Sequence, residues 1–297
     1  MTQPSLKAPT RPRGPRSGRT GLRPQNHAFG VHQVAGVDFE VPRKVQVTRE
    51  IVFFRSACGD LRLDLYWTKG RSTRPGIVFI HGGGWMKGDK TEFVWFCTML
   101  AKHGYATAAI NYRLSDQAKY PAQIEDCLEA MQWMRRNADQ YGIDADRLAT
   151  IGGSAGGHLA LMTGLMGRGE TAVQTVVSYY GAHDLNDGEQ TDGEGRDAPV
   201  KLIGGTKEQK ADLWNDALCS SHISRDCPPV LMIHGDRDVT VPISQSRKLL
   251  GLLQAAGVSA ELLVVRGAGH CLAGGQFTPT LAEIDRKLLA FLDAHLK

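Results

Sequence analysis

Residues 148–160 read LATIGGSAGGHLA. The first four form a short apolar run typical of a buried strand, and a helical pattern begins near His158. Between them, residues 152–156 (GGSAG) fit the pattern G-x-S-x-G. A strand that turns directly into a helix strains the backbone of the central residue, so very small residues are needed on both sides. We therefore predict that Ser154 is a nucleophile at this turn, facing the free N–H groups of the new helix.

A second glycine turn lies upstream, in residues 81–85 (HGGGW), directly after another apolar run. Glycines let the main chain approach a substrate and point its N–H groups toward it. We predict an oxyanion hole formed by the N–H groups of Gly83 and Gly84, together with that of Ala155 after the nucleophile. Trp85 is expected either to line the substrate pocket or to pack the turn.

Two aspartates follow the apolar run within residues 228–242 (PPVLMIHGDRDVTVP). Asp238 lies deeper in the loop before the next helical pattern, and we predict that it is the acid that orients the catalytic base. Asp236 directly follows the turn and is expected to brace the loop or to pair with Arg237.

Among the ten histidines, His270 is the predicted base. It ends the segment GAGH, directly after the strand pattern ELLVV, where a catalytic loop would begin. A neutral imidazole there can take the proton of Ser154 while Asp238 fixes its tautomer. His158 and His234 flank the predicted catalytic turns and are expected to have structural roles. No spacing of histidines and carboxylates resembles a metal site, so we expect neither a metal nor another cofactor.

Apolar runs alternate with helical patterns along most of the chain. This alternation predicts an α/β fold, with a mostly parallel, doubly wound sheet and helices on both faces. The expected strands begin with two antiparallel strands near Val45 and Leu61 and continue at 76–80, 105–110, 148–151, 174–180, 230–233 and 262–265. The expected helices cover 91–103, 121–140, 155–166, 242–256 and 280–296.

One domain is expected over residues 45–297, after a segment at 1–44 that is predicted to be a disordered basic tail or a cap. The alternation breaks at 184–228, which contains an acidic, glycine-rich stretch and a short helical pattern near 207–218. An insertion at this place would lie over the crevice where α/β proteins bind ligands. It is expected to be either a small lid or a solvated loop.

The net charge of +4 is unevenly placed, because residues 1–30 hold six basic residues and no acid. The remainder carries a slight negative charge and no basic stripe, so nucleic-acid binding is not expected. No apolar run approaches the roughly 20 residues that a membrane span needs, and no signal peptide is evident, so the expected location is the cytoplasm. The six cysteines lack CxxC pairs and are expected to be buried thiols. The sequence leaves a homo-oligomer open.

Six segments carry a resemblance to a known family: HGGGW (81–85), NYRL (111–114), YPAQIEDC (120–127), GGSAGGHLA (152–160), PPVLMIHGDRDVTVP (228–242) and GAGH (267–270). Over roughly residues 45–297 the chain resembles the esterase/lipase branch of the α/β-hydrolase superfamily. It is most similar to bacterial carboxylesterases and feruloyl-esterase-like hydrolases, with the hormone-sensitive-lipase-like esterases nearby. It departs from the last group at Gly153, where they usually carry an acid, and in having HGDRD in place of DPxxD. The resemblance implies an α/β-hydrolase fold with Ser154, Asp238 and His270 as the triad.

The predicted activity is hydrolysis of a small-molecule carboxylic ester, of short acyl chain or aryl type, through an acyl-enzyme. An amidase, formamidase or aminopeptidase is an alternative, because the same triad cleaves amides and only the pocket decides. A binding protein on this scaffold would be expected to lack a triad residue, and none is missing.

Overall fold

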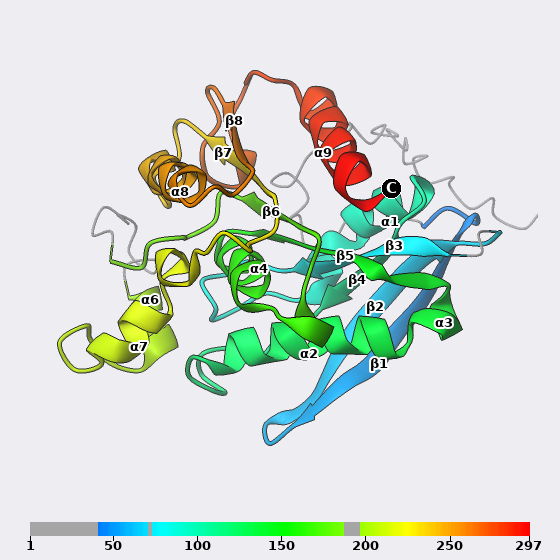
Figure 1. Ribbon diagram of the computed structural model, residues 1–297, viewed down its shortest axis with the longest axis horizontal. Coiled ribbons are helices and arrows are strands. Elements are labelled where there is room, and N and C mark those ends of the chain that lie inside the picture. Colours follow the sequence, from blue (N-terminus) through cyan, green and yellow to red (C-terminus); the bar gives the residue numbers. More distant parts are fainter. Residues whose placement is uncertain (1–40, 71–72, 187–196) are drawn as a thin grey trace, which may run out of the picture.

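A computed structural model describes residues 41–70, 73–186 and 197–297 of the chain. Its strands are β1 (Val45–Ser56), β2 (Gly59–Thr68), β3 (Arg74–Ile80), β4 (Ala106–Ile110), β5 (Ile143–Gly153), β6 (Thr175–Tyr179), β7 (Val230–Gly235) and β8 (Ala260–Val265). They form an eight-stranded sheet in the order β1-β2-β4-β3-β5-β6-β7-β8 (Figure 1). β1 and β2 pair antiparallel, β2 pairs antiparallel with β4, and all later pairs are parallel. The expected mostly parallel sheet with two antiparallel opening strands is confirmed.

The α-helices of the described residues are α1 (Val94–Lys102), α2 (Ala122–Arg136), α3 (Ala138–Tyr141), α4 (Ala155–Met166), α6 (Ala198–Ile203), α7 (Ala211–Asp216), α8 (Ile243–Ala255) and α9 (Leu281–Leu296). Short 3₁₀ turns are η1 (Lys90–Phe93), η2 (Gly169–Thr171), η3 (Cys219–His222) and η4 (His270–Leu272). Two expected helices are divided, the first into η1 and α1 and the second into α2 and α3. The second break falls at Asn137, whose side-chain amide donates to the Trp133 carbonyl at 2.8 Å and so ends α2. α6 was not expected from the sequence.

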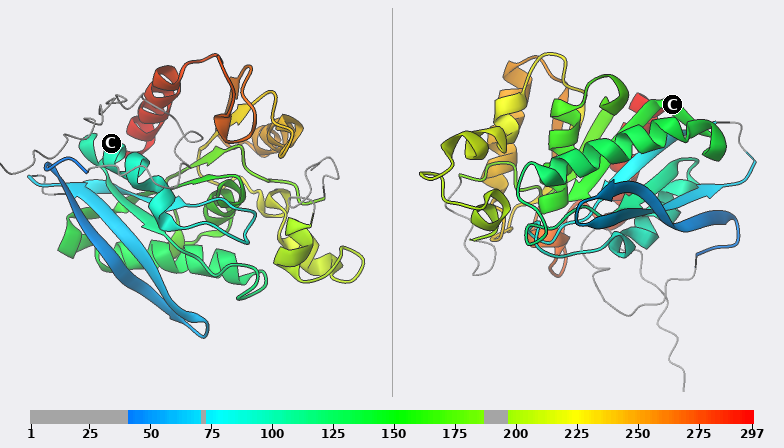
Figure 2. Two further views of the ribbon diagram at one scale, coloured as in Figure 1. Left: turned by 180° about the vertical axis from the view of Figure 1, so that it is seen from behind. Right: turned by 90° about the horizontal axis from the view of Figure 1, so that it is seen from below.

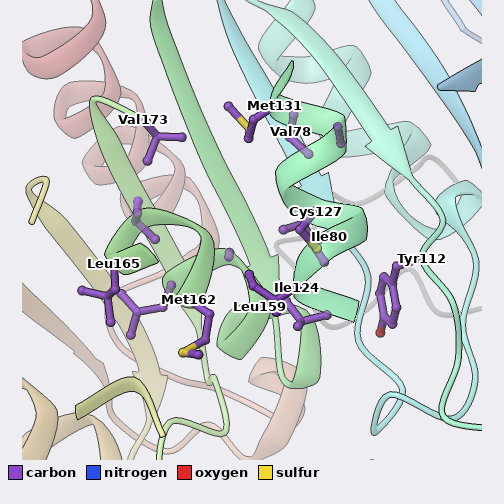
Figure 3. Packing of buried hydrophobic residues seen from close by; sticks show 14 of the residues in the cluster. Val78, Ile80, Tyr112, Ile124, Cys127, Met131, Leu159, Met162, Leu165 and Val173 are labelled. Carbon is purple, nitrogen blue, oxygen red and sulfur yellow. The ribbon is translucent and has the colours of Figure 1, made fainter. Parts of the chain in front are cut away.

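Two hydrophobic cores cover the two faces of the sheet. α2, α4 and α8 pack in one core, and α1 and α9 pack in the other. Alternate residues of β3 supply them, because Ile80 lies in the first and Phe79 in the second. Figure 3 shows part of the first core, with Ile124 of α2 and Leu159 of α4 in the cluster that contains Ile80. Figure 2 shows the β1–β2 hairpin at one edge of the sheet and α8 with β7 and β8 at the other.

The strand order reverses between β3 and β5. β4 lies beyond β3 on one side, and β6, β7 and β8 follow β5 on the other. In such sheets, the crevice for ligands forms at the carboxyl ends of the strands where the order reverses. The segments that leave β3 and β5 there are residues 81–85 and Ser154.

The described part of the insertion at 184–228 is packed against the rest of the domain. Leu202 and Trp214 are buried, and the Tyr120 N–H donates to the Leu202 carbonyl at 2.9 Å. A solvated loop therefore does not describe residues 197–222. Residues 187–196, which contain most of the glycine-rich stretch, and residues 1–40 of the predicted tail lie outside the described residues.

Four of the six cysteines are buried, as expected, but Cys58 is exposed and Cys271 is partly exposed. Within the residues that the structure describes, no helix is both long enough and apolar enough to cross a bilayer.

Candidate active site

Ser154 stands between β5 and α4 with φ 55° and ψ −122°. Positive φ is uncommon for a residue with a side chain, and its neighbours show why the turn needs glycine. A Cβ on Gly152 would stand 2.1 Å from the Gly156 carbonyl oxygen, and a Cβ on Gly156 would stand 2.1 Å from that of Ile80. The expected strand-to-helix turn is confirmed. α4 is buried at every residue but Met166, so the turn begins a helix that is fixed on all sides.

The structure brings Ser154, His270 and Asp238 into one row. His270 Nε2 lies 3.0 Å from Ser154 Oγ, and His270 Nδ1 lies 2.8 Å from Asp238 Oδ2. Because Nδ1 faces a carboxylate it carries the proton, which leaves Nε2 of the neutral ring to accept from the serine hydroxyl. The Asp238 side chain is fully buried, whereas that of His270 is 19% exposed. Asp238 therefore lies at the buried end of the row, and His270 is partly accessible to solvent.

Burial and hydrogen bonding oppose each other at both titratable members of the row. Burial disfavours the charged form of His270, but the hydrogen bonds with Asp238 and Cys271 outweigh it and raise the pKa of His270 to about 9. Burial alone would raise the pKa of Asp238, yet hydrogen bonds from His234 and His270 lower it to about 2. Asp238 is thus ionised at neutral pH and stabilises an imidazolium at His270.

The loops that carry Asp238 and His270 are joined to each other. The Arg237 N–H donates to the Ala268 carbonyl at 2.9 Å, and the Gly267 N–H donates to Asp236 Oδ1 at 2.7 Å. A Cβ on Gly235 would stand 2.2 Å from the Ala268 oxygen, so a side chain there would force the loops apart. Asp236 therefore acts as the expected brace, here on the neighbouring loop.

The glycine turn after β3 lies against the serine turn. A Cβ on Gly82 would stand 3.4 Å from the Cβ of Ser154. Gly83 and Gly84 have φ of 99° and 61°, and a Cβ on Gly83 would stand 2.0 Å from the Lys87 carbonyl oxygen. Both positions favour glycine for conformation, and Gly83 requires it for space as well. Ala155, as the first residue of α4, has an N–H without a partner inside the helix.

Trp85 and His158 pack behind the glycine turn. Trp85 is 2% exposed, and its ring meets that of His158 edge-on with 5.3 Å between centroids. His158 Nε2 donates to the Ala217 carbonyl at 2.8 Å, which ties α4 to the insertion. Burial lowers the pKa of His158 to about 4, so this ring is neutral. In this structure Trp85 packs the turn, and the structural role expected of His158 is confirmed.

A cavity of about 290 Å³ lies beside the glycine turn. It is lined by Met86, Ser115, Asp116, Lys119 and Lys201. Met86 links it to the turn, because a Cβ on Gly84 would stand 3.4 Å from Met86 Cε. These residues come from three separate segments with no shared motif, so the cavity could not be predicted from the sequence.

His234 was expected to have a structural role, but sequence reasoning missed its contact with Asp238, whose Oδ2 lies 3.1 Å from His234 Nε2. The two residues are four positions apart in HGDRD, but only the structure shows that both point inward. Across residues 41–70, 73–186 and 197–297, no three His, Cys, Asp or Glu side chains are grouped as they would be around a metal ion.

The sheet order, the serine at the strand-to-helix turn and the adjoining histidine and aspartate define an α/β-hydrolase. The family model BD-FAE matches residues 63–253. This match covers more than half of the chain, which therefore belongs to the BD-FAE family. The resemblance seen in the sequence motifs is confirmed.

Relatives and solved structures agree with this assignment. The chain is 30% identical over 250 residues to Esterase LipC of Mycobacterium tuberculosis, which covers 75% of this chain and 60% of LipC. Esterase B from Lactobacillus rhamnosis is 26% identical, with a TM-score of 0.72 over 86% of this chain and 88% of that one. A truncated carbohydrate esterase from gut microbiota has the same fold, with a TM-score of 0.73 at 23% identity over 84% of this chain and 96% of that one. The chain spans about half to three fifths of the length of the first curated relatives that it matches.

Proposed function

We propose that this chain hydrolyses carboxylic esters, with Ser154 as nucleophile, His270 as general base and Asp238 as the acid that orients it. One observation carries the proposal, namely the continuous row of hydrogen bonds from Asp238 through His270 to Ser154. The row ends on a serine with strained backbone angles beside a glycine turn, which is the arrangement that nucleophilic acyl transfer requires. The esterases named among its relatives support the same reaction class.

In the proposed reaction, Ser154 Oγ attacks the ester carbonyl carbon while its proton passes to His270 Nε2. The carbonyl oxygen becomes an oxyanion, which accepts hydrogen bonds from the N–H groups of Gly83, Gly84 and Ala155. The C–O bond of the ester then breaks, and His270 returns the proton to the leaving alcohol. Water attacks the acyl-enzyme with the same base, which releases the acid and restores Ser154.

The cavity beside Met86 is our candidate for the part of the substrate remote from the carbonyl. At about 290 Å³ it is near the lower end of ligand-site volumes, which favours a short acyl or aryl group over a long chain. Its lining combines the Met86 thioether with two lysines and an aspartate, so a compact ester with a polar substituent suits it. An amide substrate uses the same triad and is the alternative that the experiment must separate.

The test replaces Ser154 by Ala and measures the hydrolysis of p-nitrophenyl acetate, butyrate and octanoate, with the matching p-nitroanilides as the amide arm. We expect Ser154→Ala to lower kcat/KM for esters by on the order of 10⁴-fold or more, because triad residues act as a unit. A fluorophosphonate probe should modify Ser154 in the wild type, as read by mass spectrometry of its peptide. Ser259→Ala, at an exposed serine before β8, is the matched control and should keep full activity.

A folded Ser154→Ala variant with wild-type ester hydrolysis would contradict the mechanism. Faster hydrolysis of anilides than of esters would replace the esterase by an amidase.

A further inference from the structure

The Asp238 carboxylate receives hydrogen bonds from two directions. Its Oδ1 accepts from the N–H groups of Thr240 and Val241, at 2.9 and 2.8 Å, within its own loop. Its Oδ2 faces two imidazoles, with His270 Nδ1 at 2.8 Å and His234 Nε2 at 3.1 Å. The oxygen that orients His270 is therefore shared with a second histidine.

The contacts of His234 fix which of its nitrogens carries the proton. Nε2 lies between two acceptors, Asp238 Oδ2 and the Val241 carbonyl oxygen at 2.8 Å, so it must be a donor. Nδ1 lies 2.8 Å from the Ser246 hydroxyl, which donates to it when the ring is neutral. Both His234 and Ser246 are buried, so no solvent competes for these bonds.

We propose that His234 is a positioning residue of the active site, which holds the Asp238 carboxylate so that Oδ2 faces His270. The same hydrogen bond weakens the attraction of Oδ2 for the positive charge on His270. The inference rests on the proposed function, since it assigns a role within the same triad. Ser246 on α8 fixes the His234 ring in turn, so α8 and the end of β7 together determine the orientation of Asp238. Ser246, His234 and Asp238 form a second serine–histidine–aspartate row that shares its carboxylate with the first. Ser246 and His234 are buried, so no substrate can reach them.

The sign of the electrostatic effect follows from the direction of the N–H bond. His234 Nε2–H points its positive end at Asp238 Oδ2, which stabilises the carboxylate and reduces its attraction for a positive charge on His270. Without this donor, the imidazolium of His270 would hold its proton to a higher pH. Catalysis would then begin at a higher pH, because the base must be neutral to accept the serine proton.

Other titratable groups face this cluster and define the controls. His183, which follows β6, is buried, and its pKa is lowered first by burial and then by the nearby His234 and His158. Tyr180 and Cys271 face His270, and Asp236 lies on the Asp238 loop with its carboxylate on Gly267. His183 bonds Ser178 Oγ at 2.8 Å rather than any member of the row, so it is a matched buried histidine.

The experiment compares His234→Asn, His234→Gln and His183→Asn with the wild type. Asn can reach Ser246 from position 234 but is too short to reach Asp238, whereas the amide of Gln can occupy the place of Nε2. We expect His234→Asn to lower kcat for p-nitrophenyl acetate by about tenfold with little change in KM, a fraction of the roughly 10⁴-fold effect of disabling a triad aspartate. Its ascending limb in the pH profile of kcat/KM should move to higher pH, and the downfield NMR resonance of the His270 Nδ1 proton should shift. His234→Gln should restore kcat, the limb and the resonance toward wild type.

His183→Asn should lower the stability of the protein without moving the ascending limb of the pH profile. The proposal is overturned if His234→Asn leaves the ascending limb of the pH profile and the His270 Nδ1 proton resonance at their wild-type positions. It is also overturned if His183→Asn moves both by as much as His234→Asn does. If His234→Asn does not fold, Ser246→Ala serves as the test. This variant keeps the His234 imidazole but removes its hydrogen-bond partner, so the ascending limb of the pH profile should move in the same direction by less. An unmoved limb there overturns the proposal. A wild type that hydrolyses no ester and resists fluorophosphonate would instead contradict the proposed function.

Discussion

Asp236 and Asp238 are two residues apart in the same loop, yet their surroundings differ completely. Asp238 has a fully buried side chain and faces His270, while Asp236 is exposed and accepts the Gly267 N–H. The first can affect proton transfer directly, and the second can act only through the position of the loop. This difference makes the two aspartates an internal control for the proposed triad.

We expect Asp238→Asn to lower kcat by roughly 10⁴-fold, as happens when the triad aspartate of a serine protease becomes asparagine, because the neutral amide favours the wrong tautomer of the base. Asp236→Asn should cost far less, since an amide oxygen can still accept from Gly267. Steady-state kinetics on p-nitrophenyl acetate would measure both, with thermal melts to show that each variant is folded. Equal losses, or a larger loss at Asp236, would show that the triad acid is misassigned.

The pH profile of the wild type should report His270. Hydrogen bonds with Asp238 and Cys271 raise the pKa of this imidazole from 6.5 to about 9 against the effect of burial. Because only the neutral ring can accept the proton of Ser154, kcat/KM should rise with pH, with its ascending limb above 6.5. Initial rates across neutral and alkaline pH, corrected with Ser154→Ala as the blank, would test this. A limb at or below 6.5 would mean that Asp238 does not stabilise the imidazolium in solution.

At the scale of elements, the proposed site depends on strand ends that approach more closely than side chains would permit. Gly235 at the end of β7 lets the Asp238 loop meet the loop after β8, and Gly156 in α4 packs on the Ile80 carbonyl at the end of β3. The insertion adds α6, whose Lys201 carbonyl accepts from Lys119 Nζ at 3.0 Å across the cavity lining. Whether the insertion acts as a lid stays a prediction.

The cavity gives a prediction about substrate size. Met86→Trp should fill much of its volume, so kcat/KM for p-nitrophenyl butyrate should fall by on the order of tenfold relative to acetate, because a contact worth one methylene or more is lost. Met86→Ala should change the ratio in the opposite direction. Leu252→Trp, at an exposed position of α8, controls for the added indole. An unchanged butyrate-to-acetate ratio in both Met86 variants would exclude the cavity as the acyl or aryl site.

At the scale of the whole molecule, two cores fix the sheet from both faces, and the described domain contains its own candidate site. Val41 packs against the core of α1 and α9, so the described domain begins before β1. The residues before it are rich in arginine and proline and supply little apolar surface for a core.

We therefore expect a chain that starts at Val41 to keep the melting temperature and ester hydrolysis of the full chain nearly unchanged. A chain that starts at Val45 should melt slightly lower, because it lacks Val41. Thermal melts and kinetics on short and long acyl esters would compare both with a chain that starts at Gly30. A loss of activity in the chain that starts at Gly30 would show that the basic segment takes part in catalysis. A loss that appears only in the chain that starts at Val41 would place a cap within 30–40.

The strands, the major helices and the turn at Ser154 could all be predicted from the amino-acid sequence. Each of these follows from short-range physics: alternation of apolar residues sets a strand, and glycines at fixed offsets leave the space that the strand-to-helix turn at Ser154 requires. Asp238 and His270 could also be selected, because parallel strands end at one edge of the sheet and the loops there must meet. The structure places His270 beside Ser154 and Asp238 beside His270.

The contacts between segments that share no local pattern could be found only in the folded domain. The burial of Trp85 against His158, the cavity beside Met86, the formation of α6 and the bond of His234 to Asp238 all depend on how the insertion and α8 pack onto the sheet. Periodicity fixes which way a side chain points from its own element, but not what lies opposite it, since that is determined by the packing of elements far apart in the chain. The turn that presents Ser154, the proposed nucleophile, is therefore encoded locally, whereas the environment of Asp238 and the proposed space for a substrate arise only when the whole domain has folded.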